Sequence, residues 1–216
     1  MRKLPNPLLP NPFAPHGEAT PFPSALCAIT GVTALAAVLL TWLPSQPVAA
    51  FGWLKSASGT AWWRCLTCHF VHLGWRHLLL DLAALASLAA IACFRGTKSE
   101  ATWGFSVALL AGMLGVCLGL AWRDAGVTWY VGLSGALYGV FAWIVLDMAS
   151  LRHWQGRVAW GLYLCGLLKA LLDANSPVGA PGLAGIPMAP PAHLYGFLGG
   201  TLWAALRYSP RFRRER

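Results

Sequence analysis

Residues 131–148 read VGLSGALYGVFAWIVLDM, an apolar run of eighteen residues in which Asp147 is the single charged side chain. A helix rises about 1.5 Å per residue and the hydrocarbon core of a bilayer is about 30 Å thick, so a run of this length approaches a full crossing. A helix facing water would need a charged face, which this segment lacks. The run therefore predicts a membrane-spanning helix.

Runs of the same kind lie on both sides of it. The six expected spans are Leu26–Leu43, Leu78–Phe94, Phe105–Trp122, Val131–Met148, Val158–Leu172 and Ala192–Leu206. Over the whole chain of 216 residues, 57% are apolar and 11% are charged, against roughly 25% charged in soluble domains. We predict an all-α polytopic membrane protein built as a six-helix bundle, and exclude a soluble domain.

Basic residues indicate how the bundle is oriented. If the amino terminus is cytoplasmic, eleven of the sixteen Lys and Arg residues fall in cytoplasmic segments and three, Lys55, Arg64 and Arg123, in outer loops. Arg76 and Lys169 lie within or beside spans and do not count. Cytoplasmic segments carry the basic excess in membrane proteins, so both termini are expected in the cytoplasm. The same pattern explains the net charge of +9 without a nucleic-acid partner.

Proline marks the segments outside the spans. Seven prolines between Pro5 and Pro23 favour a disordered cytoplasmic tail over residues 1–23. Five prolines between Asn175 and Pro191 forbid a regular helix there and predict an outer loop that serves as a candidate lid. The expected organisation is the tail, a six-helix domain over 24–207, and a basic cytoplasmic tail over 208–216.

Polar residues near the outer ends of spans two, four and six would meet at one depth. Ser134 begins span four between Gly132 and Gly135, and His193 begins span six. Because ionisable side chains are costly in a membrane, they usually face the bundle interior or a wet cavity. Serine needs a neutral imidazole to remove its proton during attack. A Ser134–His193 pair is therefore the predicted chemistry, with no acidic third member evident.

Small residues and one aromatic side chain would support this pair. Gly196 follows His193 by three positions and lies on its face of the helix, where it can approach Gly135 of span four. Tyr138 follows Ser134 by one helical turn and is expected to stack on the His193 ring. We interpret these residues as positioning groups.

Span two carries His72, His77 and Asp81 near the same outer end. His77 and Asp81 share one helix face, and His72 lies above them. A side-chain donor such as His77 would join the Ser134 amide in stabilising an oxyanion. Asp81 would either stay protonated by burial and donate, or pair with His77 and orient its ring.

The residues that carry a family resemblance are Trp63-Arg64, Thr67, His72, His77, Gly132 to Gly135, Tyr138, Ala192-His193 and Gly196. With these motifs the sequence resembles the rhomboid intramembrane proteases over most of its length. The compact length and the stretch from Leu66-Thr67 to His77-Leu78-Leu79-Leu80 resemble the rhombosortase branch of that family.

The resemblance implies a serine endopeptidase that cleaves within or beside transmembrane segments of membrane-protein substrates, without a cofactor or metal. It implies Ser134 as nucleophile, His193 as base, and His77 as an oxyanion-side donor. The rhombosortase branch further implies processing of carboxy-terminal Gly-Gly sorting tails. We expect a multi-pass protein of a bacterial inner membrane whose site opens to the periplasmic side, because the basic residues put both termini in the cytoplasm. One departure is Asp81, because rhomboids commonly have asparagine there.

Three other functions fit parts of the sequence. An inactive rhomboid relative that binds membrane proteins is compatible with Asp81. The stretch Cys65-Leu66-Thr67-Cys68-His69 matches a c-type haem attachment pattern. Cys65, Cys68, His69, His72 and His77 also include suitable metal ligands, although their spacing does not favour a tight helical chelate.

Overall fold

The computed structural model describes residues 23–43, 47–57, 59–94, 97–123, 126–151, 153–179, 181–182, 185, 187 and 189–208. The predictions for the amino-terminal tail over 1–22 and for the basic residues 209–216 lie outside this part of the chain.

Long helices form at each of the six predicted positions. They are α1 (Ser24–Thr41), α4 (Trp75–Cys93), α5 (Lys98–Trp122), α6 (Ser134–Ala149), α7 (His153–Ala174) and α8 (Pro191–Arg207). Three of them, α1, α4 and α5, are long and apolar enough to cross a membrane, while α6 is a shorter apolar helix. Helix α5 starts with a capping box in which the side chains of Thr97 and Glu100 accept each other's backbone N–H.

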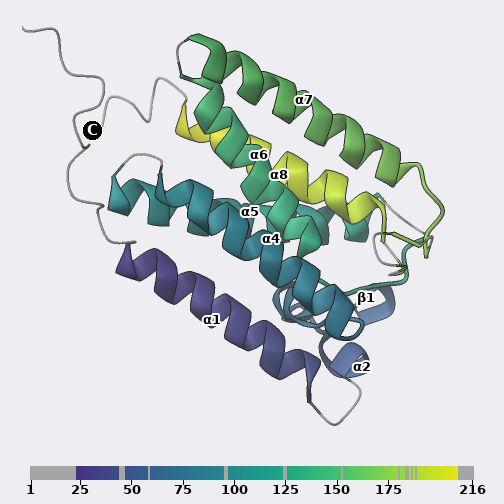
Figure 1. The fold of residues 1–216 in the computed structure, drawn as a ribbon. Helices are drawn as coiled ribbons and strands as arrows, with labels where there is room; N and C mark the ends of the chain where they lie inside the picture. The colour runs from purple at the N-terminus through teal and green to yellow at the C-terminus, as the bar shows by residue number, and fades with distance from the viewer. Residues whose placement is uncertain are drawn as a thin grey trace, which may run out of the picture.

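Short elements gather at one end of the bundle, on the right in Figure 1. They are α2 (Pro47–Phe51), β1 (Trp53–Leu54), the 3₁₀ helix η1 (Lys55–Ala57), α3 (Arg64–Thr67), the 3₁₀ helix η2 (Cys68–Phe70) and β2 (Trp129–Tyr130). Strands β1 and β2 pair antiparallel, Trp53 with Tyr130 and Leu54 with Trp129. This end also receives the starts of α4, α6 and α8.

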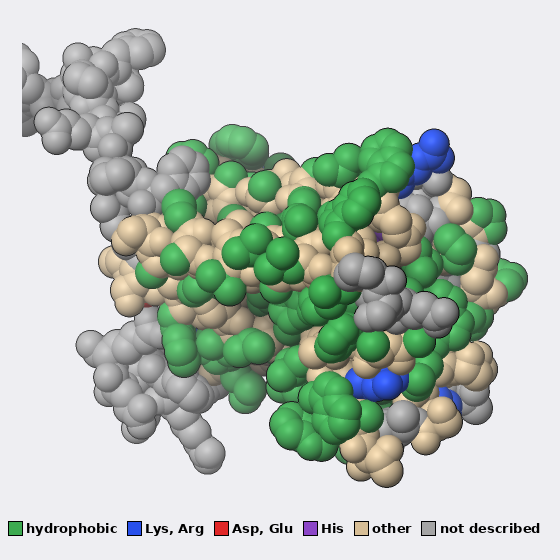
Figure 2. Space-filling model, turned by 90° about the horizontal axis from the view of Figure 1, so that it is seen from below, with side chains coloured by type: hydrophobic (Ala, Val, Ile, Leu, Met, Phe, Trp, Pro, Cys, Tyr) green, Lys and Arg blue, Asp and Glu red, His purple; other side chains and the backbone are tan. Residues whose placement is uncertain are grey.

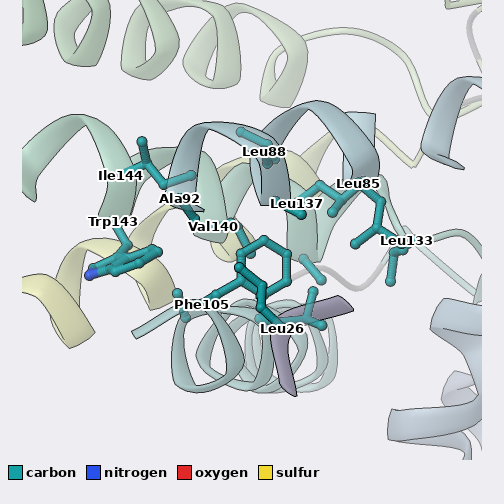
Figure 3. Close-up of a cluster of buried hydrophobic side chains, with 14 of the residues drawn as sticks. Leu26, Leu85, Leu88, Ala92, Phe105, Leu133, Leu137, Val140, Trp143 and Ile144 are labelled. Atoms are coloured by element: carbon teal, nitrogen blue, oxygen red, sulfur yellow. The ribbon is translucent and has the colours of Figure 1, made fainter. Parts of the chain in front are cut away.

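The main core lies between α1, α4, α5 and α6. Leu26 of α1, Phe105 of α5 and Leu137 of α6 are buried there and point toward one another (Figure 3). Trp143 closes the core toward the other end of α6 and is 2% exposed. Apolar side chains thus fill the interior, as they do in soluble proteins.

Glycines bring α6 and α8 into backbone contact. A Cβ atom on Gly196 would stand 1.8 Å from the carbonyl oxygen of Gly135, and one on Gly200 would stand 1.9 Å from that of Gly139. No larger residue fits either position without moving a helix. The predicted small-residue contact between the helices of Ser134 and His193 is therefore present, and we call it the glycine seam.

The outer surface is apolar as well. Large aliphatic side chains on four helices are each more than half exposed: Leu35 of α1, Leu114 of α5, Leu168 of α7 and Leu202 of α8. Figure 2 shows one face covered mostly by hydrophobic side chains, with Lys and Arg toward one end. A surface of this kind is suited to lipid rather than water.

Candidate active site

Ser134 is the first residue of α6, directly after a tight turn. Gly132 has a φ of +114°, a conformation that residues with a Cβ rarely adopt. A Cβ there would also stand 2.7 Å from the His77 ring. Gly132 therefore lets the chain turn into α6 against His77, and leaves the backbone N–H groups at the start of the helix free of intrahelical partners.

His193, on the first turn of α8, faces Ser134 across the glycine seam. The Ser134 Oγ atom lies 3.1 Å from His193 Nε2. The Tyr138 ring stacks on the imidazole, with centroids 4.5 Å apart and planes 11° from parallel. The structure thus brings together Ser134, His193, Tyr138, Gly135 and Gly196, as the sequence patterns predict.

An acidic partner for His193 comes from α7 and was missed in the sequence. Asp173 Oδ2 lies 2.9 Å from His193 Nδ1, and the Asp173 side chain also accepts from Lys169 Nζ at 2.5 and 2.7 Å. Because a carboxylate only accepts, Nδ1 carries the proton and Nε2 keeps its lone pair toward Ser134. This is the tautomer that a general base requires.

Asp173 had two signals in the sequence. It is one of only seven acidic residues in the chain, and it follows Lys169 at the i, i+4 spacing that places opposite charges on one helix face. It lies one residue beyond the expected end of span five at Leu172, since α7 continues to Ala174. Because the expected span ended at Leu172, Asp173 was not recognised as a helical partner of Lys169.

Asp81 of α4 binds the start of α6. Its Oδ2 atom accepts the backbone N–H of Leu133 at 2.8 Å and that of Ser134 at 3.1 Å. The same oxygen lies 3.1 Å from His72 Nε2 and 3.6 Å from His77 Nε2. Asp81 thus contacts His77, as one of the two sequence interpretations expects, but its shortest contacts are with the α6 turn and His72.

His77 has a defined tautomer. The backbone N–H of Leu73 donates to His77 Nδ1 at 3.2 Å, so Nδ1 is the acceptor and a neutral ring carries its proton on Nε2. That N–H faces the Gly132 turn. His72 is buried behind it and contacts Thr41 Oγ1 at 3.2 Å. His77 is therefore an available donor beside Ser134, and His72 supports Asp81.

The candidate metal ligands of the sequence separate into two groups. His72 and His77 lie beside Asp81. Cys68 and His69 instead group with Cys117 of α5. Cys68 and His69 are fully buried. Attachment of a haem at Cys65 and Cys68 would displace that packing, so the structure does not favour the haem interpretation.

Comparison with known proteins identifies the family of this chain. The Rhomboid domain family model matches residues 59–210, which contain Ser134, His193, Asp173 and Asp81. The chain belongs to the rhomboid family. The rhomboid domain and the apolar helices together identify an integral membrane protein.

Two similar proteins carry rhomboid names. Rhomboid-like protease 5 of Toxoplasma gondii is 32% identical over 152 residues, covering 67% of this chain and 16% of that protein. RHOMBOID-like protein 7 of Arabidopsis thaliana is 27% identical over 179 residues, covering 79% of this chain and 51% of that protein. The chain thus spans about half or less of the length of these relatives.

A cavity of about 430 Å³ opens beside Ser134 in this rhomboid protein. Its walls come from α4, α6 and α7, and its lining includes Ala84, Ser87, Tyr138 and Gly166 besides Ser134. Most of its surface is apolar, while Asp81 and Lys169 add polar groups. The serine hydroxyl therefore faces an open, mainly apolar space between α4 and α7, which we call the α4/α7 gap.

The described residues between α7 and α8 lie at the end of the bundle that holds β1 and the start of α6 (Figure 1). Its described residues include an antiparallel bridge between Pro181 and Pro187. Val178, Gly179 and Ala189 line a second cavity together with β2. The absence of a regular helix among these described residues agrees with the prediction from proline content.

Proposed function

We propose that this rhomboid protein is an intramembrane serine endopeptidase in which Ser134 is the nucleophile and His193 the general base. The observation that supports it most directly is the 3.1 Å contact from Ser134 Oγ to His193 Nε2, on a ring whose Nδ1 donates to Asp173 at 2.9 Å. Asp173 is then a positioning residue that holds the imidazole in the reactive tautomer. This third member goes beyond the expected dyad.

The chemistry follows from these contacts. His193 Nε2 takes the Ser134 proton while Oγ attacks the scissile carbonyl carbon. The C–N bond then breaks, and the leaving amine takes the proton from Nε2. Water entering from the outer end hydrolyses the resulting ester by the same proton path, which releases the new carboxylate and regenerates Ser134.

The oxyanion needs donors at the start of α6. His77 Nε2–H is one candidate, and the Ser134 N–H is another. The Ser134 N–H already donates to Asp81 Oδ2 at 3.1 Å, and the Leu133 N–H donates to the same oxygen at 2.8 Å. We infer that Asp81 keeps the Leu133 contact and yields the Ser134 amide to the substrate oxyanion during attack.

The α4/α7 gap suits a substrate that arrives through the membrane. Its apolar lining matches the end of a transmembrane helix, and Ser134 lies at its inner edge. A helix end that unwinds there would expose a peptide bond to Ser134. The loop 175–191 would cover the substrate from the outer side.

The proposed topology has six crossings and both termini in the cytoplasm. The start of α1 and the end of α8 lie at the same end of the bundle, opposite the start of α6 (Figure 1), as a chain with an even number of crossings requires. The basic residues put that end inside. The site then opens to the outer face, which is the periplasm if the membrane is a bacterial inner membrane.

We also propose a specific class of membrane-protein substrate. The rhombosortase-like stretch from Leu66 to Leu80 suggests proteins with carboxy-terminal Gly-Gly sorting tails. Comparing the carboxy termini of membrane proteins in cells with wild-type or Ser134→Ala enzyme tests this. Unchanged termini on Gly-Gly-tailed proteins would contradict the substrate class while leaving the chemistry intact.

One observation favours a second function, that of an inactive rhomboid relative that binds membrane proteins. Asp81 occupies the Ser134 amide that an oxyanion would need. A binding protein needs no vacant donor at that position. Measured proteolysis separates the two functions.

The experiment uses the full chain in proteoliposomes with a fluorescent transmembrane reporter. Ser134→Ala and His193→Ala should each reduce cleavage by at least about 10³-fold, because a nucleophile and its base act as a unit. Ser106→Ala, which removes a hydroxyl bonded within α5, is the matched control and should cleave normally. Cleavage that persists in either site variant, with unchanged thermal unfolding, would rule out the mechanism.

A further inference from the structure

A cluster of sulfur and nitrogen donors lies beneath the Gly132 turn, apart from the Ser134 site. Cys68 and His69 come from η2 and Cys117 from α5, and one ligand atom of each lies within 4.8 Å of the others. All three are buried, Cys68 and His69 completely. Two thiols and an imidazole brought together from two elements form a donor set typical of a transition-metal site.

The His69 ring is oriented as a ligand would be. Its Nδ1 lies 3.3 Å from the carbonyl oxygen of Gly132, and since a carbonyl only accepts, Nδ1 carries the proton. Nε2 is then the nitrogen with a free lone pair, and it is buried with no hydrogen-bond partner among the described residues. Histidines that bind metals commonly donate their other N–H to a backbone carbonyl in this way.

The thiols of Cys117 and Cys68 converge on one backbone carbonyl oxygen. Cys117 Sγ donates to the carbonyl oxygen of Cys65 at 2.9 Å, and Cys68 Sγ lies 3.7 Å from the same oxygen. The Cys65 thiol also contacts that of Cys117. Cys65 and Cys68 have the Cys-x-x-Cys spacing found in structural zinc sites.

We propose that this cluster is a structural Zn²⁺ site with Cys68, Cys117 and His69 Nε2 as ligands and Cys65 as the fourth. Zinc bonds of about 2.3 Å to sulfur and 2.0–2.1 Å to nitrogen place tetrahedral donors about 3.5–3.8 Å apart. From a separation of at most 4.8 Å among Cys68, His69 and Cys117, these three side chains need to close by about 1 Å. Binding releases the thiol protons to water as the thiolates form.

The site would brace the turn that leads to Ser134. The backbone N–H of Gly132 donates to the Cys68 carbonyl at 2.9 Å, and the Gly132 carbonyl accepts from His69 and from the Tyr130 hydroxyl at 2.7 Å. Burial raises the pKa of Tyr130 well above its usual value, which keeps that donor protonated. Zinc would therefore fix the element on which Gly132 rests.

Metal analysis of the full chain tests the site independently of proteolysis. Protein purified in detergent with reductant and without chelator should hold about one zinc ion per chain, since a four-ligand site binds a single ion. Cys68→Ser and Cys117→Ser should lose that zinc. Cys165→Ser, which changes an exposed cysteine of α7, is the matched control and should retain it. Ser134→Ala should bind zinc as the wild type does, whatever its activity.

A second measurement uses only wild-type protein, so that a cysteine variant that fails to fold cannot confuse the result. Wild-type protein stripped by a chelator should show cobalt–thiolate charge-transfer bands when Co²⁺ is added, and its unfolding midpoint should rise when Zn²⁺ is restored. Reduced wild-type protein that holds no zinc and gives no such bands would overturn the proposal. A disulfide linking two of Cys65, Cys68 and Cys117 in protein isolated without reductant would overturn it as well.

Discussion

The two sides of Ser134 are built in opposite ways. On one side, the glycine seam presses the backbones of α6 and α8 together, with Gly196 against Gly135. On the other, α4 and α7 make almost no direct contact along their described residues, and the gap of about 430 Å³ separates them. The contrast indicates that geometry is fixed at the seam and access is provided at the gap.

Breaking the seam should have the largest effect. The Cβ of Gly196→Ala would stand 1.8 Å from a backbone oxygen, so α8 must move and carry His193 with it. Overpacking costs about 1–3 kcal/mol, and a displacement of about 1 Å at a reacting group costs on the order of 10²-fold in rate. We expect a lower unfolding midpoint in detergent and a loss of reporter cleavage of more than about 10²-fold, since the displaced helix carries both His193 and its contact with Ser134.

The matched control is Gly161→Ala in α7, where an added Cβ meets nothing within 4 Å. It should leave both unfolding and cleavage unchanged. Equal behaviour of the two alanine variants would show that backbone contact at the seam is unimportant.

Removing the charge of Asp173 should have the next largest effect. It should lower activity and leave the stability of the fold nearly unchanged. Asp173→Asn keeps the side-chain shape but no longer holds the proton on His193 Nδ1 unambiguously. We expect cleavage to fall by about 10²-fold, less than the roughly 10⁴-fold of a triad with the wrong tautomer, because Tyr138 still stacks on the ring. Unfolding should change little, because the amide keeps the shape of the buried side chain and the half-exposed Lys169 can be solvated when it loses its charged partner.

A serine-directed fluorophosphonate probe measures this prediction as well as reporter cleavage does. Labelling of Ser134 should slow in parallel with cleavage. Normal labelling with slow cleavage would instead place the role of Asp173 in substrate binding.

Filling the gap should have a smaller and more selective effect. Ser87 lines the gap and is exposed, so Ser87→Trp narrows the entrance without disturbing the core. We expect about tenfold slower cleavage of a transmembrane reporter, which corresponds to about 1.4 kcal/mol, with normal hydrolysis of a small soluble ester. Ala86→Trp, on an exposed neighbouring position outside the lining, is the control; equal slowing by both variants would contradict lateral entry.

Asp81→Asn should have the smallest effect. The amide oxygen still accepts from Leu133 N–H, and the new N–H₂ group supplies a donor for the oxyanion. We expect cleavage to stay within about threefold of wild type or to rise, since a neutral side chain yields the Ser134 amide more readily. A large loss in kcat would show that the carboxylate itself is required.

The sequence predicted the helices well because long uncharged runs have few alternatives in chemistry or structure. It also predicted the partners of the seam, since Gly196 follows His193 at a helical spacing of three and was expected to pack against Gly135 of span four. Both inferences rest on local periodicity. The rhomboid family model then covers the same region.

Contacts that depend on how helices approach one another were harder to predict. Asp173 contacts His193 from a different helix. Asp81 accepts from the backbone N–H groups of Leu133 and Ser134, and every residue except proline has such a group, so the sequence does not single out these two. The Cys117 contact with Cys68 and His69 joins residues about fifty positions apart. Such tertiary contacts leave no periodic signal in one sequence.

The short length of α6 would limit which proteins can reach Ser134. Its 16 residues span about 24 Å, some 6 Å less than the hydrocarbon core. If its inner end is level with the membrane boundary, Ser134 lies about one helical turn below the outer surface. If the proposed activity and topology hold, a folded protein in the outer compartment could not lower a surface loop to that depth. The recessed hydroxyl would then spare proteins that a protease with an exposed site would degrade.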